Sequence, residues 1–156
     1  TIFNNIAFGI DGATQEIVEQ AAKDAQVHAN ISDFPNGYNT KVGERGVTLS
    51  GGQKQRVSIA RAIIKNPKIL IFDDSLSAVD TETEERILQN LKRIMADKTT
   101  VIISHRVSSV KHCDEIVVLE KGMIVEKGSH DFLLKEDGYY AELYKKQLDE
   151  NRPELF

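Results

Sequence analysis

The sequence predicts an α/β fold in which parallel strands alternate with helices. Two apolar runs, KILIF (68–72) and TTVIIS (99–104), are typical of strands, and a helical pattern separates them. This strand–helix–strand order indicates a parallel pair joined by a right-handed crossover. A helical pattern also precedes the first run, and a hairpin pattern follows the second.

The segment before the first strand is expected to hold two helices joined by a polar loop. Residues 14–28 carry apolar side chains on one helical stripe. The loop over 32–46 is polar and contains Pro-Asn-Gly, a strong turn signal. Ser50 and Gln53 form a capping box, so we expect a helix that begins there and ends near residue 65, before an Asn-Pro pair.

The segment from residue 68 onward is expected to supply the sheet and the last helices. The KILIF run is continuously apolar, so we expect both of its faces to be buried, and we expect a buried strand over 99–104 as well. Thr81 and Glu84 form a second capping box, which predicts the start of the intervening helix. The remaining expected elements are a hairpin over 115–128 that turns at Lys121-Gly122, helices near 129–135 and 138–149, and a loose tail over 150–156.

The composition is that of an ordinary globular chain. The length of 156 residues fits one domain, and the net charge of −4 argues against a nucleic-acid binder that works through a basic face. The single cysteine, Cys113, excludes an internal disulfide and a cysteine-based metal site. No apolar stretch approaches the ~18 residues that span a bilayer. Because the chain does not begin with methionine, we expect it to be part of a longer polypeptide.

Two adjacent carboxylates follow the first predicted strand. Asp73 and Asp74 stand at its carboxyl end, and Ser104-His105 follow the next strand. Ligands of parallel sheets bind at such ends. Four apolar residues and an aspartate resemble a Walker B motif, in which the aspartate holds Mg²⁺ and the next residue faces the attacking water. Since successive strand residues point in opposite directions, the two aspartates are expected to differ in function. From these residues alone, the alternative that both cap a loop stays open.

The LSGGQ segment, residues 49–53, opens the second predicted helix. Its two glycines let a phosphate approach the backbone, and a helix N-terminus attracts negative charge. Ser50 can either cap the helix or donate to a phosphate oxygen. Taken alone, the glycines could equally be a flexible entry to the helix.

Together these segments resemble the ABC ATPase family in order and spacing. The resemblance covers nearly the whole chain. The matching motifs are the signature LSGGQ, the Walker B strand ILIFD, the D-loop SAVD (77–80), the switch histidine Ser104-His105-Arg106, the exporter-type loop KVGERG (41–46), TIFNNIAFG (1–9) after the Q-loop, and the carboxyl-terminal helices over 128–147. The implied fold is a partial P-loop NTPase core over 66–156 with parallel strands, preceded by the ABC helical subdomain over 1–65.

The resemblance also implies roles for individual residues and two cofactors, ATP and Mg²⁺. Asp73 would serve Mg²⁺, Asp74 would be the catalytic base, and His105 would contact the γ-phosphate within its own subunit. The residues implied to face ATP bound to the opposite subunit, or to lie in the loop that crosses to it, are Ser50, Gly51, Gly52, Gln53 and Asp80. The other histidines, His28, His112 and His130, are expected to be structural.

The sequence departs from the family pattern in two places. The first is the missing Walker A motif, G-x-x-x-x-G-K-[ST], which cradles phosphates. The nearest match is Gly46 through Gly51, but it is followed by Gly52-Gln53 where the motif has lysine and then serine or threonine. The chain also lacks a Q-loop, so we expect it to bind ATP poorly and to be inactive by itself. The second departure is Asp74, where the family usually has glutamate. The carboxylate is then withdrawn by ~1.5 Å, and misplacement on the order of 1 Å can cost about 10²-fold in rate.

The resemblance implies an ABC exporter, with its transmembrane domain on the same polypeptide and its ATPase at the cytoplasmic face of the membrane. Because Asp74 would give a slow site, we expect a second cassette from a different subunit, forming a heterodimer with one degenerate site. An ABC ATPase of DNA repair or chromosome maintenance is expected to carry coiled-coil insertions or basic surfaces, and neither is present. A translation factor with two cassettes is not excluded. A non-catalytic interaction domain is disfavoured by the intact signature and His105.

Overall fold

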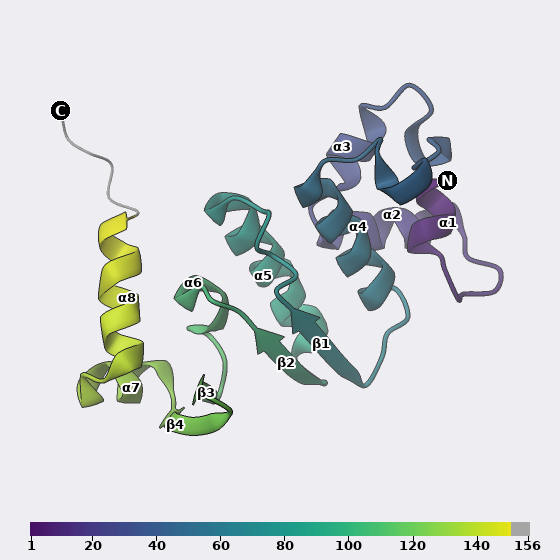
Figure 1. Cartoon of the computed structure of the whole chain (residues 1–156). Helices are drawn as coiled ribbons and strands as arrows, with labels where there is room; N and C mark the ends of the chain where they lie inside the picture. Colours follow the sequence, from purple (N-terminus) through teal and green to yellow (C-terminus); the bar gives the residue numbers. More distant parts are fainter. Residues whose placement is uncertain (151–156) are drawn as a thin grey trace. The chain divides into compact units, whose positions relative to one another are not determined.

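The computed structural model describes residues 1–150, which form two compact units (Figure 1). The first unit is Thr1–Ile103, and the second begins at Ser104. This division separates segments that each pack mainly on themselves. The family-based division at residues 65 and 66 stays a prediction.

The first unit joins a group of helices to a two-stranded parallel sheet. One continuous apolar core runs through it, from Ile6 in the first helix to Leu70 in the first strand and Leu91 in the last helix. Its helices and strands are α1 (Ile2–Ile6), α2 (Gln15–Asp24), α3 (His28–Ser32), the short 3₁₀ helices η1 (Gly37–Asn39) and η2 (Glu44–Gly46), α4 (Gly51–Ile63), β1 (Ile69–Asp73), α5 (Thr81–Met95) and β2 (Thr99–Ile103).

Two of the predicted helix starts can be compared with the structure. The capping box at the start of α4 is confirmed, because Gln53 N–H donates to Ser50 Oγ at 3.2 Å and Ser50 N–H donates to Gln53 Oε1 at 2.9 Å. The second box is wrong. Helix α5 is capped one residue earlier, by Asp80, whose side chain accepts from Thr83 N–H, and Glu84 is fully buried.

The predicted helix over 14–28 is interrupted in the structure. Helix α2 ends at Asp24, and α3 begins at His28. Between them Gln26 has φ of 54°, a left-handed conformation that an α-helix cannot continue through. The apolar stripe alone does not reveal this interruption, since Val27 and Ile31 beyond it are buried in the same core as Ala22 before it.

The two strands form the predicted parallel pair, with Ile69 opposite Thr99 and Asp73 opposite Ile103. The expected burial of both faces is wrong. Leu70 and Phe72 are buried, whereas Ile69 is 61% exposed and β2 also alternates in exposure. In the first unit, one face of this sheet belongs to the apolar core and the other is exposed. An apolar sequence cannot say how many faces are covered.

The second unit consists of a short helix, a hairpin and two further helices around a small core. The predicted hairpin is confirmed, and its two turn residues, Lys121 and Gly122, both have positive φ, as a two-residue turn between twisted strands requires. The elements are α6 (Val107–Val110), β3 (Ile116–Glu120), β4 (Met123–Gly128), α7 (His130–Glu136) and α8 (Tyr139–Glu150). Both terminal helices match their predictions, and the predicted tail lies outside the described residues after Glu150. Over residues 1–150, no helix combines the length and apolar character needed to cross a membrane.

The core supports a stability prediction. Ile59 of α4 is 2% exposed, so Ile59→Ala removes packed methyl groups and should lower the free energy of unfolding by about 2–5 kcal/mol. Ile17→Ala is the matched control, because Ile17 is 43% exposed and its loss should change stability by about 0.5 kcal/mol or less. Urea unfolding followed by circular dichroism measures both, and equal losses would contradict this core assignment.

Candidate functional site

The N-terminus of α4 presents the signature segment to solvent. Leu49 is buried and anchors the segment, whereas Ser50 and Gly51 are exposed. The first amide groups of a helix have no acceptor within the helix, so this turn can receive an anion. Capping leaves capacity for a ligand, because the Ser50 hydroxyl accepts from Gln53 N–H and still has its own proton to donate.

The first turn of α4 packs against the loop that joins β1 to α5. This loop, residues 74–80, is called the 74–80 loop below. A Cβ atom on Gly52 would lie 2.8 Å from the backbone oxygen of Ala78, which no side chain tolerates. A Cβ on Gly51 would lie 3.6 Å from the Ala78 Cβ, an ordinary contact. Glycine at position 52 is therefore required by packing, independently of any ligand.

The exporter-type loop is attached to the same helix. The Lys54 ammonium donates to the Arg45 carbonyl at 3.1 Å, and the Thr48 hydroxyl donates to the Lys41 carbonyl at 3.1 Å. Arg45 itself has φ of 54°. The loop and the signature segment are thus held together by side chains that the motif comparison did not single out.

Asp73 and Asp74 have different backbone conformations. Asp73 ends β1 as an extended residue, and Asp74 has φ of 48°, with its N–H donating to the Ile103 carbonyl at 3.0 Å. Both side chains are exposed. Aspartate is enriched in this left-handed region relative to most other residues, which gives a local reason for aspartate at position 74.

Asp80, at the end of the 74–80 loop, caps α5. Its Oδ1 accepts from Thr83 N–H at 2.9 Å. This hydrogen bond lowers the pKa of the Asp80 carboxyl below its usual value, and the Arg56 charge acts in the same direction. Asp80 is therefore held ionised at the N-terminus of a helix, with its side chain exposed.

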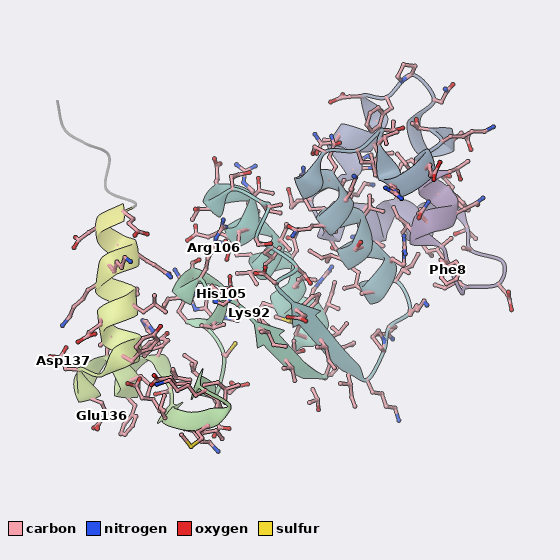
Figure 2. The ribbon with its side chains drawn as sticks, in the orientation of Figure 1. Phe8, Lys92, His105, Arg106, Glu136 and Asp137 are labelled. Carbon is pink, nitrogen blue, oxygen red and sulfur yellow. The ribbon has the colours of Figure 1, made fainter. Side chains whose placement is uncertain are left out.

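His105 lies in the second unit, in the segment between β2 and α6 (Figure 2), whereas all the other candidate residues lie in the first. Its side chain is exposed. The side chain of Gln147 on α8 holds the backbone around it, donating to the His105 carbonyl at 2.8 Å and accepting from Val107 N–H at 2.8 Å. Sequence reasoning missed Gln147, because no local pattern links it to a residue 42 positions away.

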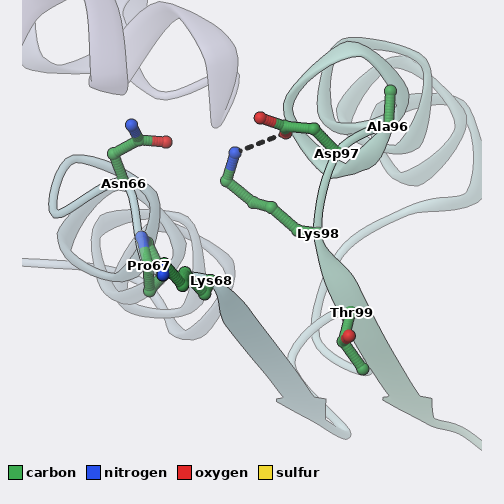
Figure 3. A pocket seen from close by; sticks show the side chains of 7 residues that line it. All are labelled: Asn66, Pro67, Lys68, Ala96, Asp97, Lys98 and Thr99. Atoms are coloured by element: carbon green, nitrogen blue, oxygen red, sulfur yellow. Dashed lines mark hydrogen bonds and ion pairs between the residues drawn. The ribbon is translucent and has the colours of Figure 1, made fainter.

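A depression of about 590 Å³ lies at the amino ends of the strands, opposite the end that carries Asp73 (Figure 3). Lys98 and Asp97 form an ion pair of 2.7 Å at its edge. It is lined by Asn66, Pro67, Lys68, Ala96, Asp97, Lys98 and Thr99, none of which belongs to the predicted site.

The residues present suit a Mg²⁺ ion shared with a nucleotide. Over residues 1–150, no group of three or more His, Cys, Asp or Glu side chains could hold a metal ion alone. Asp73 offers one exposed carboxylate, and Mg²⁺ is commonly held by one or two carboxylates together with water and substrate phosphates. The fit is therefore to an ion that arrives with phosphates.

The contact between Gly52 and Ala78 supports a second prediction. Gly52→Ala forces the 74–80 loop away from α4 and should lower stability by about 1–3 kcal/mol, the range for overpacking. Gly51→Ala is the control and should be neutral or stabilising, because it restores helix propensity without a close contact. Thermal unfolding compares them, and equal melting temperatures would show that the close approach is absent.

Comparisons with known proteins agree with the motifs. The family model described as ABC transporter matches residues 2–77. The chain is 54% identical to an uncharacterised ABC transporter ATP-binding protein, YknU, of Bacillus subtilis over 94% of this chain and 25% of that protein. It is 49% identical to an ATM1-type heavy metal exporter of Novosphingobium aromaticivorans over 97% of this chain and 25% of that protein.

A solved structure extends the similarity to the fold. The chain matches a bacterial Atm1-family ABC exporter with ATP bound at a TM-score of 0.90 and 49% identity, over 95% of this chain and 26% of that one. The chain thus spans about a quarter of the length of these relatives. It belongs to the ABC transporter family, as part of the ATP-binding domain.

Proposed function

We propose that the chain is the carboxyl-terminal part of the ATP-binding cassette of an ABC exporter. In the complete protein, ATP binding and hydrolysis at the cytoplasmic face of the membrane drive a substrate across it. The observation that carries this proposal is the exposed N-terminus of α4, packed through Gly52 on the loop that begins at Asp74. The names of the relatives include a heavy metal exporter and a lipid A-core flippase, so these relatives do not share one transported substrate.

The signature segment binds the γ-phosphate of an ATP held by a second cassette. The Ser50 hydroxyl donates to a phosphate oxygen while it caps the helix, and the first-turn amides of Gly51 and Gly52 complete the anion site. The Gln53 carboxamide, whose oxygen is taken by Ser50 N–H, keeps its NH₂ for the same ligand. The groups that preorganise the turn thus also bind the ligand.

The residues that end or follow the two parallel strands serve a different ATP. Asp73 supplies a carboxylate to Mg²⁺, which when bound neutralises phosphate charge. Asp74 orients or deprotonates the attacking water from a left-handed backbone, and His105 contacts the γ-phosphate. Asp80 keeps its charge in the loop that faces the partner cassette.

These assignments favour a heterodimer. This chain's signature completes a site whose base belongs to the partner, and its own Asp74 builds a slow site. A homodimer would have the short base in both sites. We therefore propose a partner cassette that carries glutamate at the matching position.

Introduction of a bulky charged side chain tests the signature assignment. Ser50→Arg places a bulky cation at the α4 N-terminus, blocks docking of the γ-phosphate and should reduce ATP turnover of the full-length assembly at least tenfold. Ser58→Arg is the matched control, since Ser58 is exposed on the same helix beyond the first turn. Phosphate release measures both, and equal turnover in the two variants would refute the assignment.

A charge removal tests the heterodimer. Asp74→Asn should leave most of the ATP turnover of the assembly, because the efficient site draws its base from the partner. Asp11→Asn, an equal charge change at an exposed residue, is the control. A loss of turnover by about two orders of magnitude, the range for a removed general base, would make Asp74 the working base and the asymmetric arrangement wrong.

A further inference from the structure

The side chain of Gln55 connects α4 to the 74–80 loop. Its Nε2 donates to the Asp74 carbonyl at 3.3 Å and to the Ser77 hydroxyl at 2.9 Å, and its Oε1 accepts from Ala78 N–H at 2.9 Å. These partners lie 19 to 23 residues away in the sequence. A single carboxamide therefore spans both ends of the bend that follows β1.

The chemistry of the partners determines the orientation of this carboxamide. A backbone N–H can only donate, so the oxygen of Gln55 must face Ala78. The NH₂ group then faces the Asp74 carbonyl, which can only accept. Glutamate at position 55 would keep the first interaction and lose the second, and an apolar residue would lose both.

The bend at Asp74 has a backbone conformation that hydrogen bonds from other residues must stabilise. Asp74 is left-handed at φ of 48°, a conformation that aspartate adopts more readily than most residues but that still needs surrounding contacts to hold it. Its carbonyl accepts from Gln55, and also from the Ser77 hydroxyl and Ser77 N–H at 2.9 and 3.3 Å. Gln55 is the one of these donors that belongs to another element, α4.

We propose that Gln55 is a positioning residue that holds the Asp74 backbone and ties it to the helix of the signature segment. The inference rests on the proposed function, in which Asp74 and the signature segment serve two different ATP molecules. Docking of a phosphate at the α4 N-terminus is then transmitted to Asp74 through two contacts, Gln55 with the bend and Gly52 with Ala78. The link lies within one chain and couples the two sites of the dimer.

The first measurement is hydrogen exchange of the full-length protein, followed by mass spectrometry of a peptide that covers residues 73–80. Gln55→Ala should speed exchange there about tenfold, because the acceptor of Ala78 N–H and the support of the bend are lost together. Gln55→Glu should show an intermediate rate, since it keeps that acceptor. Gln20→Ala is the control, because Gln20 is an exposed glutamine whose side chain donates to Asp24 on the same helix, α2. Unchanged exchange in Gln55→Ala would overturn the proposal.

The second measurement is a double-mutant cycle of Gln55 and Asp74, with the rate of ATP turnover as the readout. It uses an assembly in which the partner's base is replaced by its amide, so that turnover passes through the site with Asp74. Gln55→Ala should lower kcat about tenfold with little change in KM for ATP, and Gln55→Glu should not rescue kcat, since it cannot donate to the Asp74 carbonyl. The double variant of Gln55→Ala and Asp74→Asn should be no slower than Asp74→Asn alone.

The outcomes separate the two proposals. Multiplicative losses in the double variant would show that Gln55 acts independently of Asp74 and would overturn the inference. Rescue of kcat by Gln55→Glu would overturn it as well. Absence of ATP turnover in the unmodified full-length assembly would instead refute the proposed function, while the exchange measurement would still decide whether Gln55 holds the bend.

Discussion

The close approach of the first turn of α4 to the 74–80 loop is the contact on which the candidate site depends. It is possible only because position 52 has no side chain, since a Cβ there would meet the Ala78 carbonyl at 2.8 Å. The approach brings a helix N-terminus next to the loop that follows the Walker B strand. Together with the hydrogen bonds of Gln55, this contact connects the caps of α4 and α5, which are Ser50 and Asp80.

In this unit, the groups that stabilise the helices are also the ones proposed to meet a ligand. Ser50 caps α4 through its oxygen and keeps a proton for a phosphate, and Asp80 caps α5 while it stays ionised. Since a capping hydrogen bond restricts the rotamer of its side chain, these residues are oriented before any ligand arrives. A substitution at either position therefore changes both the helix and the site.

Two glutamines extend the site beyond its motifs. Gln55 holds the Asp74 bend from α4, and Gln147 holds the His105 backbone from α8. Each uses both ends of its carboxamide, with the oxygen on a backbone N–H and the NH₂ on a carbonyl. Neutral side chains of this kind can fix irregular backbone without adding charge near a site that we propose to receive phosphates.

The sequence by itself determined the parallel strand pair, the capping box at Ser50, the hairpin turn at Lys121-Gly122 and the family, because these depend on motifs and patterns that are local in the chain. Tertiary structure decided the rest. The break at Gln26, the burial of Glu84 and the exposure of Ile69 depend on which surfaces meet, and so does the requirement for glycine at position 52. An apolar run reports that a strand can be buried, whereas the number of its faces that are packed depends on elements distant in the sequence.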